Sequence, residues 1–107
     1  MKEIVYNTNE MAWQEAKEYP SGAMVKILRE GGPTEGRTIL LKLPPEWEMK
    51  AHSHTTVEQH YVLEGEYTSQ GKIFPAGSYQ LIPRETNHGP FTTGPSTVIL
   101  VIWDPLP

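Results

Sequence analysis

The chain contains no cysteine among its 107 residues. This absence excludes disulfide bonds, thiolate nucleophiles and cysteine-ligated zinc, and it is typical of proteins of the cytoplasm. Any metal site must therefore be built from histidine and carboxylate ligands.

Long apolar runs and an excess of basic residues are also missing. No stretch of 18 apolar residues occurs, and the first six residues are too polar for a secretory signal, so we expect a cytoplasmic protein without a membrane partner. The 9 Lys and Arg residues are dispersed and are outnumbered by 13 Asp and Glu, which gives a net charge of −4. A nucleic-acid partner is not expected, because the basic patch that binds phosphates is absent.

Chain-breaking residues are abundant, with 10 prolines and 9 glycines spread along the chain. Such spacing disfavours long helices and predicts an all-β fold of short strands joined by turns. The length suits a single domain over residues 1–107 with one core. Local patterns predict strands, a hairpin turn at Gln70-Gly71 and one short helix with Asn9 at its N-cap. The predicted strands cover 2–6, 23–29, 37–43 and 96–103, and the predicted helix covers 9–18.

Three of the four histidines and a glutamate lie between residues 52 and 65. In an extended chain alternate side chains point to the same face, so His52 and His54 project together, and Glu58 and His60 can do likewise. Imidazole and carboxylate together favour one divalent transition metal ion, of which Fe, Mn, Ni, Co and Zn are all candidates. The remaining histidine, His88, follows a strand-like segment and is the natural further ligand.

The same residues resemble the two sequence motifs of the cupin superfamily. His52 and His54, then Glu58, then Gly65 match the first motif at each expected position. The segment from Gly77 through Pro83 to His88 resembles the second motif, although Glu85 stands where a glycine is usual. The resemblance implies a double-stranded β-helix, or jelly-roll barrel, that agrees with the all-β prediction. It also implies that His52, His54, Glu58 and His88 are metal ligands.

His60 is unexpected in this motif, because cupins commonly carry an aromatic residue at that position. Its parity places it inward, two residues after Glu58. One hypothesis makes His60 a catalytic proton shuttle or a hydrogen-bond partner of the substrate. The alternative is a histidine that orients Glu58.

Shorter elements resemble a cupin subgroup that includes acetylacetone-cleaving dioxygenases and the cupin domains of zinc-binding anti-sigma factors. These elements are Met11-Ala12-Trp13, Leu43-Pro44-Pro45, Tyr61-Val62-Leu63-Glu64-Gly65 and His88-Gly89-Pro90.

Three functions with a small-molecule ligand follow from this resemblance. The first is a dioxygenase in which Fe(II) binds O₂ and a diketone-like or phenolic substrate. The second is a metal-dependent isomerase or lyase acting on sugars or uronates, with His60 moving a proton. The third is a non-enzymatic sensor of metal or small molecules. The resembling sensors carry a further helical domain for which 107 residues leave no room, so an enzyme is favoured.

Residues around the motifs have more ordinary interpretations. Trp47 and Met49 are expected to pack between the sheets or at a dimer contact, and Tyr61, Val62 and Leu63 to build the core. Arg84 is a candidate for holding a substrate carboxylate, although an arginine in such a turn is more often exposed to solvent. Tyr79, Gln80, Phe91 and Trp103 are candidate pocket residues, with packing as the favoured role. The apolar final strand and the tryptophans predict a symmetric homodimer.

Overall fold

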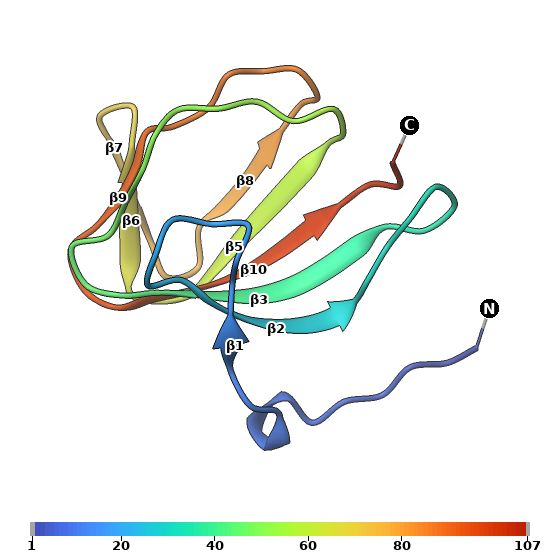
Figure 1. Cartoon of the computed structure of the whole chain (residues 1–107). Coiled ribbons are helices and arrows are strands. Elements are labelled where there is room, and N and C mark those ends of the chain that lie inside the picture. Colours follow the sequence, from blue (N-terminus) through green and yellow to red (C-terminus); the bar gives the residue numbers. More distant parts are fainter. Residues whose placement is uncertain (1, 107) are drawn as a thin grey trace.

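Two antiparallel β-sheets pack face to face in the computed structural model, which describes residues 2–106 (Figure 1). The larger sheet has the strand order β1 (Gln14–Glu15), β2 (Met24–Arg29), β3 (Arg37–Leu43), β10 (Thr97–Trp103), β5 (Glu58–Glu64) and β8 (Tyr79–Ile82). The smaller sheet has the order β4 (Glu48–Met49), β9 (Phe91–Thr93), β6 (Glu66–Ser69) and β7 (Lys72–Pro75). The predicted all-β jelly roll is confirmed.

The core lies between the sheets and is filled by alternate residues of their strands. Ile39 and Leu41 of β3 and Val101 of β10 point inward from the larger sheet, and Tyr67 and Phe91 face them from the smaller one. Each such side chain contributes about 1.5–3 kcal/mol when it is removed from water. The apolar final strand alternates between buried and half-buried positions. The inner face therefore carries the core contacts.

Gly65 joins the two sheets where β5 ends and β6 begins. Its φ is +73°, and a Cβ atom at this position would lie 2.2 Å from the carbonyl oxygen of Ser96. Only glycine can adopt this conformation with the neighbouring backbone so close. The last position of the first motif is thus required by packing rather than by chemistry.

The predicted hairpin is present, with Gln70 and Gly71 between β6 and β7. Both residues have positive φ, 51° and 76°, as a tight two-residue hairpin turn requires. This hairpin lies at the outer end of the smaller sheet (Figure 1).

The prediction for the N-terminal region was wrong. Instead of a helix over 9–18, a single 3₁₀ turn spans Thr8–Glu10 and is capped by the side chain of Asn7. The next residues form β1, which pairs with β2 through Gln14 and Val25, so a sheet edge overrides the helical pattern. Residues 2–6, predicted as a strand, lie outside every strand of the described chain and extend away from the barrel (Figure 1).

The outer face of the larger sheet carries exposed apolar residues. Val62 is buried as predicted, but Tyr61 and Leu63 point outward and are 43% and 44% exposed. Tyr79 and Leu81 of the edge strand β8 stand beside them and are also exposed. Within residues 2–106, no helix has the length and apolar character needed to cross a membrane.

Candidate metal centre

Backbone hydrogen bonds bring the two sequence motifs together. The amide of His52 donates to the carbonyl of His88 at 2.9 Å, and the amide of His88 donates back to His52 at 2.7 Å. The amide of Glu85 donates to the carbonyl of His54 at 2.6 Å. Glu85 adopts a φ of 56°, so the turn that usually contains glycine forms here with glutamate. The segment before β5 is therefore a loop tied to the loop after β8, not the strand that the alternation predicted.

Three histidines converge at this junction and could hold a metal ion. One ring nitrogen from each of His52, His54 and His88 lies within 4.8 Å of the others. The ring of His52 is centred 4.3 Å from that of His88 and 4.8 Å from that of His54. This arrangement joins residues more than 30 positions apart, as the sequence predicted for His88.

The hydrogen bonds of His52 leave one nitrogen available. Its Nδ1 lies 3.0 Å from the carbonyl oxygen of Lys50. Because a carbonyl can only accept, Nδ1 carries the proton and Nε2 keeps its lone pair. A backbone partner on one ring nitrogen is the usual way in which a metal-binding histidine is oriented.

His88 shows most directly that the residues fit a metal. Its side chain is 4% exposed, and both ring nitrogens are buried without a hydrogen-bond partner among the described residues. An unmade hydrogen bond of this kind costs about 1–3 kcal/mol, so buried polar atoms are rarely left alone. Burial also lowers the pKa of His88 to about 4, which keeps the ring neutral and able to bind a metal.

Glu58 lies on β5 beside the histidines, and its carboxylate is 3% exposed. The indole Nε1 of Trp103 donates to its Oε1 at 2.7 Å, and Nε2 of His54 lies 3.0 Å from the same oxygen. Burial would raise the pKa of Glu58, but the hydrogen bonds with His54 and His60 outweigh it and lower that pKa. The carboxylate is therefore ionised in the fold. The same hydrogen bond with Glu58 raises the pKa of His54 against the opposing effect of burial.

His60 points inward from β5 as its parity predicted, and both of its ring nitrogens have partners. Nε2 contacts Oε2 of Glu58, and Nδ1 lies 3.2 Å from the hydroxyl of Tyr67. That hydroxyl in turn donates to Oε1 of Gln80 at 2.6 Å. A chain of hydrogen bonds thus runs from Gln80 to Glu58.

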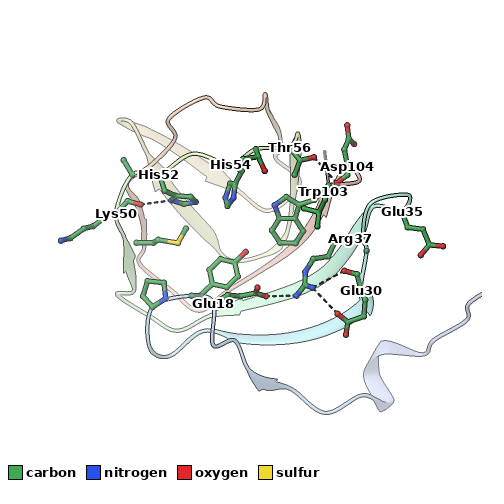
Figure 2. A pocket seen from close by; sticks show the side chains of 18 of the residues that line it. Glu18, Glu30, Glu35, Arg37, Lys50, His52, His54, Thr56, Trp103 and Asp104 are labelled. Atoms are coloured by element: carbon green, nitrogen blue, oxygen red, sulfur yellow. Dashed lines mark hydrogen bonds and ion pairs between the residues drawn. The ribbon is translucent and has the colours of Figure 1, made fainter.

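A cavity of about 860 Å³ opens beside the histidines, with His52 and His54 in its wall (Figure 2). A void of only about 20 Å³ lies deeper between the sheets and is bordered by Glu58 and His60. Tyr19, Met49 and His52 border both spaces. A ligand can therefore approach His52 and His54 from the large cavity, whereas His60 and His88 do not line that cavity.

The structure tests several predictions for the surrounding residues. Trp47 is buried in the core and Met49 packs against it, as expected, and Met49 also borders the cavity. Arg84 is exposed, as favoured, and does not line the cavity. The cavity instead contains Arg37, with Glu18 and Glu30 beside it, and Trp103, which was expected mainly to pack (Figure 2). The sequence showed no local signal for this grouping, because its members come from distant segments.

The fold and the histidine cluster agree with the comparison to known protein families. Residues 1–106 match the ChrR cupin-like domain family, and the chain belongs to it. No curated protein matches the chain significantly.

Solved structures with the same fold include a cupin from Ralstonia eutropha, with 21% identity and a TM-score of 0.81 over 98% of this chain and 70% of that one. An acetylacetone dioxygenase from Acinetobacter johnsonii is similar over 97% of this chain and 74% of its own, with 14% identity and a TM-score of 0.76. The anti-sigma factor ChrR of Rhodobacter sphaeroides, solved in complex with SigE, matches 90% of this chain and 50% of its own, with 23% identity and a TM-score of 0.73. At these identities the similarity shows a shared cupin fold.

Proposed function

We propose that this chain is a metal-dependent dioxygenase that acts on a small diketone-like or phenolic molecule. The observation that carries the proposal is the buried, unpartnered ring of His88 in a cluster with His52 and His54, beside a cavity large enough for such a molecule. The fold shared with an acetylacetone dioxygenase supports this choice of reaction.

The metal ligands in this proposal are His52, His54 and His88, with Glu58 as the fourth. Oε1 of Glu58 and Nε2 of His54 are 3.0 Å apart, a spacing that lets both atoms face one ion. When bound, an ion such as Fe(II) supplies the activation of O₂ and of the enolised substrate. Three histidines and one carboxylate would leave coordination positions of the ion open to other ligands.

The residues behind Glu58 hold its carboxylate in one orientation. The indole of Trp103 binds one oxygen and the imidazole of His60 binds the other. Outer partners of this kind fix the direction of a ligating carboxylate. We therefore assign His60 a positioning role, because both of its nitrogens are engaged and it borders only the small inner void.

This placement of His60 also bears on the isomerase or lyase alternative. That reaction needs an acid or base that reaches the substrate. The tyrosine at the cavity is Tyr19, and burial, followed by the nearby carboxylates of Glu58 and Glu18, raises its pKa. Tyr19 therefore keeps its proton at neutral pH, so it offers the substrate an acid but no base.

A sensor remains a second candidate, because the matching family takes its description from ChrR and an anti-sigma factor shares the fold. A sensor and an enzyme both need the histidine cluster, so loss of metal does not distinguish the two functions. Only the enzyme converts a substrate, so turnover distinguishes them.

Oxygen consumption tests the proposal. Protein reconstituted with Fe(II) should consume O₂ when pentane-2,4-dione or a catechol is added, and the same protein loaded with Zn²⁺ should not. A His88→Leu variant serves as the second control and should lose both iron and oxygen uptake. If the iron-loaded protein consumes no oxygen with diketones or phenols, the dioxygenase proposal is wrong and the sensor becomes the better account.

A further inference from the structure

Charged side chains are unevenly distributed around the large cavity. Five acidic residues border it, whereas Arg37 and Lys50 are the basic residues that do so within residues 2–106, apart from the histidines of the metal centre. The carboxylates belong to Glu18, Glu30, Glu35, Glu48 and Asp104. A negative potential of this kind repels anions that approach the site.

Arg37 would normally be the residue that captures a carboxylate or phosphate, because its planar group binds such anions through two hydrogen bonds. Here both of its terminal nitrogens already have partners. Its Nη2 binds Oε1 of Glu18 at 2.8 Å, and its Nη1 lies 3.4 Å from Oε2 of Glu30 and 3.3 Å from the carbonyl of Glu30. The guanidinium also lies over the ring of Trp103, 5.8 Å from its centroid.

Lys50 does not replace Arg37 as an anion-binding residue. Figure 2 shows its side chain extending away from the cavity, while its backbone carbonyl faces His52. The wall nearest the metal centre is formed instead by uncharged side chains, including Tyr19, Met49 and Trp103.

We propose that the ion pairs of Glu18 and Glu30 with Arg37 mask the cavity's arginine and restrict the site to uncharged or cationic substrates. The inference rests on the proposed function and deepens it, because it names the charge class of the substrate. An enolised or neutral diketone satisfies this restriction. Uronates and other carboxylates do not.

The test compares three probes of similar size: benzoate, benzyl alcohol and benzylamine. Binding is followed by titration of the ¹H–¹⁵N signal of the Trp103 indole, which borders the cavity; the chain has only three tryptophans. Each variant is measured in the same metal state, so any bond between benzoate and the metal affects all variants alike. Wild-type protein should bind benzyl alcohol and benzylamine more tightly than benzoate.

A double variant, Glu18→Gln with Glu30→Gln, removes both partners of Arg37. It should raise the affinity for benzoate relative to benzyl alcohol by about tenfold, because two repelling charges are lost and one arginine becomes available. The matched control, Glu35→Gln with Glu48→Gln, removes the same charge from the cavity without changing the contacts of Arg37. Because Glu35 and Glu48 make no ion pair with Arg37 and their charges are screened by salt, the ratio should change only about twofold.

Two results overturn the inference. One is an affinity for benzoate, relative to benzyl alcohol, that is the same in wild-type protein and in the Glu18→Gln, Glu30→Gln variant. The other is an equal change of this relative affinity in both double variants, which would show that the total charge of the cavity, not the masking of Arg37, determines which ligands bind. Neither result depends on oxygen consumption, so failure of the dioxygenase assay is a separate outcome.

Discussion

Replacement of His88 by leucine should stabilise the metal-free protein while it removes the metal centre. The imidazole is buried, and its two nitrogens lack hydrogen-bond partners within residues 2–106. Folding without metal therefore removes both nitrogens from water without replacing their hydrogen bonds. Leucine has a similar volume and no polar atom. The substitution therefore removes a cost from the metal-free fold and a ligand from the metal-bound one.

The size of the effect follows from the two unmade hydrogen bonds. The free energy of unfolding of the metal-free protein should rise by about 2–6 kcal/mol, which is about 1–3 kcal/mol for each nitrogen. For a chain of this length, each kcal/mol corresponds to a rise in Tm of roughly 4 °C. Wild-type protein should instead gain about 2.7 kcal/mol when the free metal concentration is a hundred times its Kd, and the variant should gain nothing.

The assay is thermal unfolding with chelator and with added Zn²⁺, for wild type, His88→Leu and His52→Leu. His52 is the matched control because its Nδ1 already binds a carbonyl at 3.0 Å. Its replacement should also abolish the response to metal, but it should not stabilise the metal-free protein. If His88→Leu is less stable than wild type without metal, or keeps the metal-dependent rise in Tm, the reasoning is refuted.

Three further predictions follow from the centre and the sheet. Burial lowers the pKa of His88 from 6.5 to about 4, so below pH 6.5 the unfolded chain binds a proton that the folded chain does not bind. Acidification towards pH 4 should therefore lower the free energy of unfolding of the metal-free protein by up to about 3 kcal/mol. Denaturation measured as a function of pH should show no such loss for His88→Leu. Trp103→Phe keeps the ring but removes the donor to Glu58, and calorimetric titration should show metal affinity reduced about tenfold or more; unchanged affinity would exclude the positioning role. The predicted homodimer should form through the exposed apolar face of β5 and β8. The double variant Tyr79→Glu with Leu81→Lys should therefore be a monomer in light scattering. A monomeric wild-type protein would contradict the homodimer prediction.

Local patterns in the sequence were sufficient for most of the fold. The apolar, β-branched run over residues 37–43 became β3 with the predicted bounds, and the turn at Gln70-Gly71 followed from the residues that tolerate positive φ. The N-terminal helix failed because pairing with β2 competes with a weak local preference. Alternation on β5 correctly placed Glu58 and His60 inside. Tyr61 and Leu63 have the opposite parity and point outward, so the prediction that they build the core was wrong.

Only those site residues that belong to the two sequence motifs could be predicted. His52, His54 and His88 could be grouped in advance, and the structure brings their ring nitrogens within 4.8 Å. The contact between Trp103 and Glu58 spans 45 positions, and the ion pairs of Arg37 join separate loops. Such contacts depend on how the two sheets pack together, so no local sequence pattern predicts them. For the same reason, parity gave the direction of His60 but not its distance from the cavity.

The most direct test of the metal centre is elemental analysis of the protein purified without a histidine tag, in parallel for wild type and His88→Leu. We predict close to one equivalent of a first-row divalent metal per chain in wild type and almost none in the variant. Wild-type protein without metal even after incubation with Fe(II), Mn²⁺ or Zn²⁺, or equal metal content in both proteins, would contradict the account.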